Sequence, residues 1–135
     1  MAFQRLTGHS RYMTFPSAGT IAAGSAAQFD ESGEVVIAAT DKTIVGINLA
    51  AATSSTNASL DIIDHGSIWR CTTFTGTYAA THIGKVCTID AGLTPDIDTT
   101  TNADATIVNG DAVGNTYVDL VFNNAGLVRT EAGAA

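Results

Sequence analysis

The residues that could carry acid–base or metal chemistry are few and scattered. The sequence has three histidines and two cysteines, which are His9, His65, His82, Cys71 and Cys87. The stretch "HGS" at 65–67 places a histidine two residues before a serine, but neighbours in one turn rarely provide the base and nucleophile of a hydrolytic triad. The nucleophile-elbow pattern G-x-S-x-G is absent, and the cysteines and histidines lack the short repeated spacing of zinc ligands. These patterns predict no catalytic residues, and therefore a protein that is not an enzyme.

The acidic run "DIDTTTNADA" at 96–105 comes nearest to a metal site. Oxygen-bearing side chains alternate along it, as they do in a calcium loop. The EF-hand loop requires glycine at its sixth position and a bidentate glutamate at its twelfth, where this sequence has Thr101 and Ile107. We therefore expect a solvated loop or an edge strand here, with no bound metal and no cofactor.

Charge along the chain is sparse and mostly acidic. There are 13 acidic and 6 basic residues, and the formal net charge is −7. Nucleic-acid binding needs clustered lysine and arginine, and no window reaches the roughly 18 consecutive apolar residues of a membrane span. The sequence therefore predicts neither a nucleic-acid partner nor a membrane partner.

Residues 1–18 form a basic segment ahead of an acidic remainder. They hold Arg5 and Arg11 and no acidic residue, and Pro16 marks the joint to the rest of the chain. We expect an extended N-terminal arm at 1–18 and a single β domain at 19–135. Arg5, Arg11 and Phe15 are predicted to contact a partner protein or a neighbouring subunit. The alternative is a frayed terminus with two solvated arginines.

The chain beyond the arm predicts short strands separated by turns. β-branched or aromatic runs lie at 34–39, 43–48, 60–64, 67–74, 84–89, 105–109 and 116–122. The first two runs are close enough to form a hairpin around 40–42, and "GTIAAGSAAQF" predicts two very short strands around a tight turn at Gly24. Helix formers other than alanine are scarce, so 48–59 is expected to be a loop and 78–84 at most one helical turn. The predicted fold class is all-β: a small antiparallel β-barrel or β-sandwich with an extended N-terminal arm and little helix.

Alternation along two strands separates core from surface. The predicted inward positions of "TYVDLVF" are Val118, Leu120 and Phe122. In "SIWRCTTF", Trp69 is expected to anchor the core and Arg70 to point outward as a candidate subunit contact. Cys71 and Cys87 are expected to be small buried hydrophobic residues, and a single disulfide between them stays open.

The order of these features resembles the tailed-bacteriophage capsid decoration proteins, also called cement or head-stabilising proteins. A short polar arm precedes "AGTIAAGSAAQFDESGEVVIAATDKTIVGINL", in which a glycine-flanked strand pair leads to a strand, a Thr/Asp turn and "IVGI" at 44–47. "HIGKVCTIDAGL" and "NTYVDLVFN" fit the same style of small barrel, so the resemblance covers residues 17–125, although the segment at 48–59 is longer than the family pattern.

The resemblance implies a function without catalysis. It implies a homotrimer on the outer surface of an icosahedral capsid, where it bridges and stabilises neighbouring major capsid subunits. It also implies assembly in the reducing host cytoplasm, and therefore free cysteines.

Two other functions stay open from the sequence. One is a carbohydrate- or receptor-binding β module of a virion fibre, because β-sandwiches host many such sites. Modules of this kind usually display several exposed aromatic side chains, and most of the nine aromatics here are needed for the core. The other is a small hydrolase, which the missing triad pattern disfavours.

Overall fold

The protein folds into short strands with almost no helix. The structure is a computed structural model that describes residues 3–38, 43–54, 56–64, 66–90 and 94–126. Its elements are β1 (Phe3–Arg5), β2 (Tyr12–Pro16), β3 (Ala26–Phe29), β4 (Val35–Ile37), β5 (Gly46–Asn48), β6 (Asn57–Ile62), β7 (Ile68–Cys71), the 3₁₀ turn η1 (Ala80–His82), β8 (Val86–Asp90), β9 (Thr94–Asp96), β10 (Ala105–Gly110) and β11 (Val118–Phe122). The predicted all-β class is confirmed, and η1 lies where a single turn was expected.

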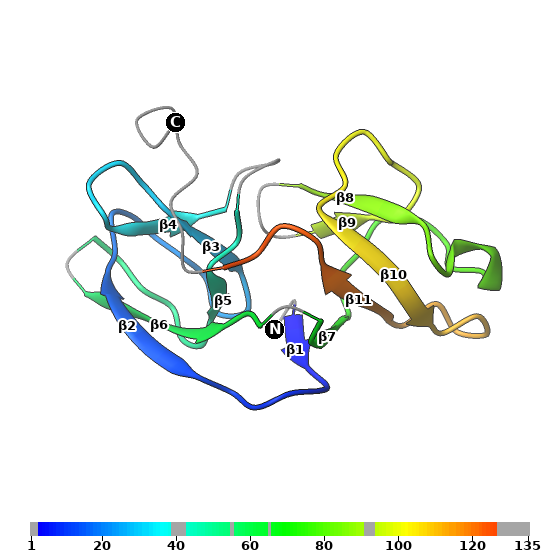
Figure 1. Cartoon of the computed structure of the whole chain (residues 1–135), viewed down its shortest axis with the longest axis horizontal. Coiled ribbons are helices and arrows are strands. Elements are labelled where there is room, and N and C mark those ends of the chain that lie inside the picture. The colour runs from blue at the N-terminus through cyan, green and yellow to red at the C-terminus, as the bar shows by residue number, and fades with distance from the viewer. Residues whose placement is uncertain (1–2, 39–42, 55, 65, 91–93, 127–135) are drawn as a thin grey trace.

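The strands form two antiparallel sheets that lie side by side (Figure 1). The six-stranded sheet has the order β1-β7-β11-β10-β8-β9, and the five-stranded sheet has the order β2-β6-β5-β3-β4. An isolated bridge between Ser17 and Val35 links the two edges of the five-stranded sheet. Another bridge, between Ile44 and Ala125, joins the segment before β5 to the segment after β11. The structure therefore agrees with a β-sandwich whose smaller sheet curls towards closure.

The N-terminal segment contributes one strand to each sheet. β1 pairs with β7, with Phe3 opposite Cys71, and β2 pairs with β6, with Met13 opposite Leu60. The segment is extended, as expected, but residues 3–16 are part of the β body rather than an arm beside it. The physical reason is that both strands complete ladders of existing sheets, and that Phe3 is fully buried in the core.

The predicted hairpin between 34–39 and 43–48 is wrong. β3 lies between β4 and β5 and pairs with both of them. A tighter local turn explains this order, because Asp30 accepts hydrogen bonds from the backbone N–H groups of Ser32 and Glu34, and Gly33 takes a φ of 84°. β4 therefore folds back onto β3 before β5 is reached. The centre of the expected hairpin, 40–42, falls outside the described residues.

Two apolar clusters hold the sheets together. The larger cluster spans both sheets and includes Trp69, with the predicted inward residues Val118, Leu120 and Phe122. The smaller cluster lies on the other face of the five-stranded sheet. Strand alternation produces this division, since Ala26 belongs to the larger cluster and Ala27 to the smaller. Both alanines are fully buried, so β3 contributes to both clusters.

Gly46 marks the closest backbone approach in the five-stranded sheet. A Cβ at this position would lie 2.6 Å from the carbonyl oxygen of Asp61 on β6, whereas a Cβ at Gly19 would meet nothing within 4 Å. We predict that Gly46→Ala lowers the free energy of unfolding by about 3 kcal/mol through overpacking, and that the control Gly19→Ala changes it by about 0.5 kcal/mol or less. Urea denaturation followed by circular dichroism measures both, and equal effects of the two substitutions would contradict the predicted register.

Candidate interaction surface

Arg5, predicted to lie at an interface, is instead buried between the two sheets. Its guanidinium donates from Nη2 to Oδ1 of Asp61 at 2.9 Å and from Nε to Oδ2 at 3.2 Å. The same group lies over the ring of Trp69, with Cζ 4.6 Å from the centroid, and only 8% of the Arg5 side chain is exposed. Arg5 is on β1 of the larger sheet and Asp61 on β6 of the smaller one, so this pair connects the sheets within one chain.

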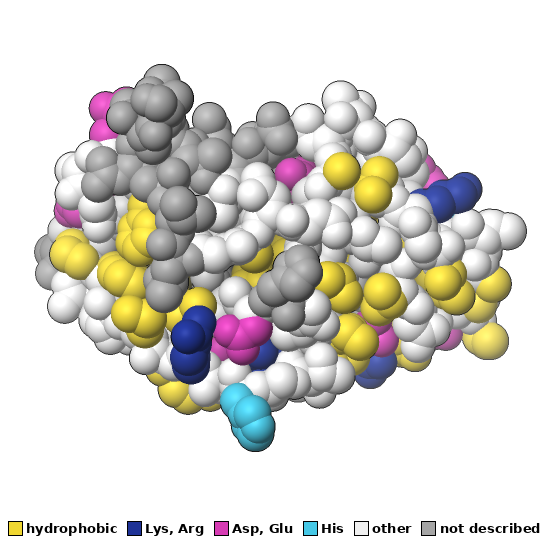
Figure 2. Space-filling model, viewed as in Figure 1, with side chains coloured by type: hydrophobic (Ala, Val, Ile, Leu, Met, Phe, Trp, Pro, Cys, Tyr) yellow, Lys and Arg dark blue, Asp and Glu magenta, His cyan; other side chains and the backbone are white. Residues whose placement is uncertain are grey.

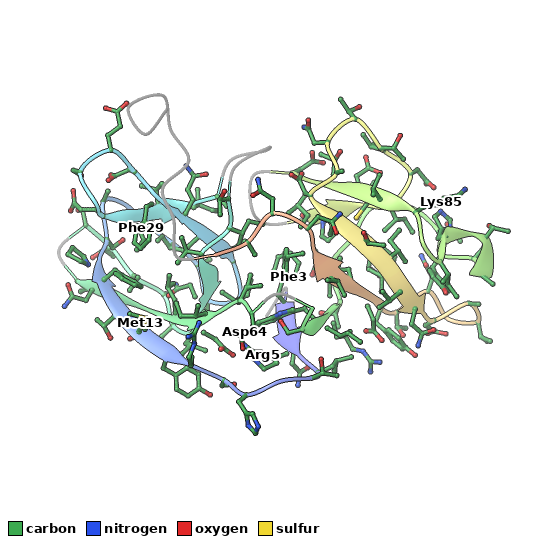
Figure 3. All side chains as sticks on the ribbon, viewed as in Figure 1. Phe3, Arg5, Met13, Phe29, Asp64 and Lys85 are labelled. Atoms are coloured by element: carbon green, nitrogen blue, oxygen red, sulfur yellow. The ribbon has the colours of Figure 1, made fainter. Side chains whose placement is uncertain are left out.

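Arg11 lies beside this pair but at the surface. Its Nη2 is 3.2 Å from Oδ1 of Asp64, and 59% of its side chain is exposed. Asp64 also lies 3.8 Å from Nη1 of Arg5, and Asp61 accepts further hydrogen bonds from Ser10 Oγ and from the Arg11 backbone N–H. The basic charge of the N-terminal segment is therefore largely matched by acids of the same chain. Figure 3 shows Arg5 and Asp64 together at the junction of the sheets.

Exposed apolar side chains are concentrated around Arg11 in the sequence. Among the described residues, five large apolar side chains are exposed, and three of them, Leu6, Tyr12 and Met13, fall between residues 6 and 13. Leu6 follows β1, while Tyr12 and Met13 begin β2. Figure 2 shows hydrophobic and charged side chains side by side on this part of the molecule. We call Leu6, Arg11 and Tyr12 the N-terminal surface.

Phe15 belongs to the wall of the five-stranded sheet. It is half-buried on β2 and meets the ring of Phe29 edge-on, with centroids 5.0 Å apart and an interplanar angle of 86°. Both rings pack against the smaller apolar cluster. Phe15 therefore contributes to this wall, and it shares β2 with Tyr12 and Met13.

Arg70 points outward, as predicted, on the opposite side of β7 from Trp69. It donates from Nε and Nη2 to the two carboxylate oxygens of Asp119, at 2.8 and 3.0 Å, and its Cζ lies 3.7 Å from the centroid of the Tyr117 ring. The hydrogen bonds to Asp119 raise the pKa of the Arg70 guanidinium. Register places Arg70 directly opposite Asp119, so a fixed cation is displayed on this sheet face.

The remaining chemistry-bearing groups serve local structure. Nε2 of His82 lies 2.9 Å from Asp98, and its Nδ1 lies 3.1 Å from the backbone N of Ala79. Burial raises the pKa of Cys71 to about 11 and that of Cys87 to about 12, and both cysteines are free. The disulfide that the sequence left open does not form, and both thiols are protonated at neutral pH.

The acidic run at 96–105 separates its carboxylates. Asp96 accepts from the Asp98 backbone N–H and from Thr99 Oγ1, whereas Asp104 is buried and accepts from the backbone N–H of Ile89. Within the described part of the chain no three histidine, cysteine or acidic side chains come together as metal ligands would. His65 falls outside the described residues.

Asp61 and Asp111 are the important residues that the sequence reasoning missed. Asp61 could have been found, because "LDIID" places it between the apolar residues Leu60 and Ile62 in a strand, where a buried acid requires a cationic partner. Asp111 was harder to single out from the sequence, because "NGDAVGN" resembles any other polar turn. In the structure it accepts hydrogen bonds from the backbone N–H groups of Val113, Gly114 and Thr116.

No relative supplies a function for this surface. Comparison with protein-family models gives no match, and comparison with curated proteins gives none either. Within the described part of the chain, none of the helical segments has the length and apolar character that crossing a membrane requires. The function must therefore be inferred from the fold and from the surface chemistry.

Breaking the buried pair should be costly. Arg5→Ala leaves the carboxylate of Asp61 buried without its main partner, and we expect unfolding free energy to fall by about 3–5 kcal/mol. Arg11→Ala, which removes an exposed charge, should cost at most about 1 kcal/mol. Chemical denaturation of both variants measures the difference. A loss below about 1 kcal/mol for Arg5→Ala would show that the pair does not hold the sheets together.

The Asp111 turn gives a prediction about pH. Hydrogen bonds from Thr116 Oγ1 and then from Gly114 N–H lower the pKa of Asp111 from 3.8 to about 2. Because the folded pKa is depressed, the stabilisation is complete above 3.8 and is lost as the pH falls through about 2. We expect the carboxyl carbon of Asp111 to titrate near 2 by NMR, and Thr116→Val to move that midpoint upwards. A midpoint near 3.8 in the folded wild type would contradict the turn geometry.

Proposed function

We propose that the protein is a structural virion component: a homotrimeric decoration protein that binds the outside of an icosahedral phage capsid and bridges neighbouring major capsid subunits. The observation that carries the proposal is the N-terminal surface, where exposed apolar groups flank an exposed arginine. Aromatic and arginine side chains contribute most of the binding energy at protein interfaces. The order of sequence features from residue 17 to 125 supports the choice of a capsid as the partner.

The fixed relation of the two sheets supports a mechanical role. The pair between Arg5 and Asp61 is linked to the N-terminal surface, because the Arg11 backbone N–H also donates to Asp61. A surface held in place before binding loses less conformational entropy when it binds. A capsid offers many identical sites, so modest contacts at each site add up across the shell.

The Arg70 face is our candidate for the contact within the trimer. Its guanidinium is already oriented by Asp119 and Tyr117, and a third of its side chain is exposed. An oriented, partly desolvated arginine is a typical interface residue. This assignment keeps the N-terminal surface available to the capsid.

The aromatic side chains disfavour the carbohydrate-binding alternative. All nine aromatic residues lie in the described part of the chain, and Tyr12 alone among them is exposed. A glycan site built on stacking usually needs several exposed rings. The fibre-module function therefore has less support than capsid decoration.

Capsid binding can be tested with point substitutions. Deleting residues 1–16 is unsuitable as a test, because the deletion removes β1 from the six-stranded sheet and β2 from the five-stranded sheet. We expect Tyr12→Ser and Leu6→Ser each to lower occupancy on DNA-free expanded capsids of the phage that encodes the chain by about tenfold, which corresponds to about 1.4 kcal/mol. Co-sedimentation and particle imaging measure the occupancy.

Val113→Ser is the matched control for this experiment. Val113 is completely exposed, but it lies in the turn between β10 and β11 of the other sheet. Its substitution should leave occupancy unchanged. The proposal is wrong if wild-type protein does not bind the capsids, and the surface assignment is wrong if all three variants bind like wild type.

A further inference from the structure

β2 is an edge strand whose outer side is open along residues 12–14, whereas beyond Pro16 the chain is joined to β4 by the Ser17–Val35 bridge and by the hydrogen bond from the Ala18 N–H to the Val35 carbonyl. It pairs with β6, and the backbone N–H of Ile62 donates to the carbonyl of Arg11 at 2.8 Å. Backbone groups alternate in direction along an antiparallel strand. Residues 11, 13 and 15 therefore face β6, and Tyr12 and Thr14 direct their N–H and C=O groups away from the sheet. Figure 1 shows β2 on the outside of its sheet.

This edge lacks the usual protection against pairing. Exposed edges in natural proteins are commonly blocked by charges, bulges or prolines. Residues 12–15 are "YMTF", which carries no charge, and their register with β6 runs without a bulge. Tyr12 and Met13 are 65% and 40% exposed. Only Pro16, at the end of β2, lacks a backbone donor, so it limits how far an added strand can extend.

We propose that β2 pairs antiparallel with β2 of a second copy of the chain, about a two-fold axis that passes beside Met13. Tyr12 of each copy then lies opposite Thr14 of the other. Since these residues have their backbone groups directed outward, each of the two Tyr12–Thr14 pairs forms two N–H to C=O hydrogen bonds. The five-stranded sheets of the two copies become one continuous sheet.

The side chains favour a second copy over an unrelated strand, because every pair that this register brings together is compatible. Met13 meets Met13 of the second copy in a pair without backbone hydrogen bonds, where the Cα atoms approach to about 4.5 Å. Tyr12 lies opposite Thr14, an aromatic residue against a β-branched one. The next pair brings Arg11 opposite the ring of Phe15, a favourable cation–aromatic arrangement. No like charges oppose each other.

This contact goes beyond the proposed function and does not depend on it. It uses the edge of β2, whereas the trimer contact proposed above uses the outer face of β7 and β11. Because it engages Arg11 and Tyr12 of the N-terminal surface, pairing through β2 and binding to the capsid through that surface are alternative states of one copy. If both contacts form, two trimers join into a hexamer. If the trimer does not form, the same contact gives a dimer. In either case, disrupting it halves the particle mass.

A cysteine crosslink tests the register. Met13→Cys places two thiols opposite each other across the axis, and gentle oxidation should convert most of the protein to a covalent dimer on a non-reducing gel. Tyr12→Cys is the control, since its two thiols are offset along the strands by a diagonal of about 7–8 Å. Cys71 and Cys87 are buried and should not react. Absence of the Met13→Cys dimer, or equal crosslinking of both variants, overturns the proposed register.

A mass measurement tests the contact without a crosslink. Thr14→Pro removes a backbone N–H that points away from β6 and that the second copy would use. Met13→Lys places two lysines opposite each other across the two-fold axis. Each substitution should therefore halve the particle mass found by light scattering. Thr14→Ala and Met13→Leu keep the donor and the apolar contact and should retain the wild-type mass. Circular dichroism confirms that each variant is folded. A wild-type monomer, or an unchanged mass in both disruptive variants, overturns the proposal. A monomer that assembles only with an added extended peptide would assign this edge to a different protein.

Discussion

The bidentate contact between Arg5 and Asp61 fixes how the two sheets sit against each other. A carboxylate placed between apolar strand residues is tolerated only if a cation and further donors replace the lost water. The cation comes from the other sheet, and Ser10 and the Arg11 backbone, both on the crossover between the sheets, supply the remaining hydrogen bonds. Trp69 covers the guanidinium from the side of the core. These hydrogen bonds to Asp61 fix the path of residues 6–11. They thereby help to place Leu6 and Tyr12 at the surface.

Strand alternation made much of the fold predictable. The period of two in "TYVDLVF" and "SIWRCTTF" was enough to place Val118, Leu120, Phe122 and Trp69 inside and Arg70 outside. Strand pairing was harder to predict, because a short strand can form backbone hydrogen bonds with any of several other strands. The order β5-β3-β4 depends on the Asp30 turn and on the small side chains of β3, and neither fact is visible in periodicity. β1 and β2 were missed as sheet strands because their partners lie far along the chain.

The same distinction between local and long-range features applies to the candidate interface residues. Arg70 could be assigned to the surface because strand parity is a local property. Arg5 could not be assigned correctly, since its burial depends on Asp61, which lies 56 residues further along the chain. A count of charges in residues 1–18 treats both arginines alike, although one closes an internal ion pair and the other is exposed. Net charge describes long-range attraction, and it does not reveal which charges are matched within the fold.

The pairing of β1 with β7 also constrains the order in which the chain can fold during its synthesis. Phe3 is made first, but the residue opposite it, Cys71, appears 68 positions later. Until then the first strand has no ladder to join and its phenylalanine remains exposed. Closing such long loops slows folding, because their entropy must be lost before the contact stabilises the chain. The five-stranded sheet, whose last strand ends at Ile62, can assemble earlier. Synthesis therefore favours an order in which the smaller sheet forms before β1 joins β7.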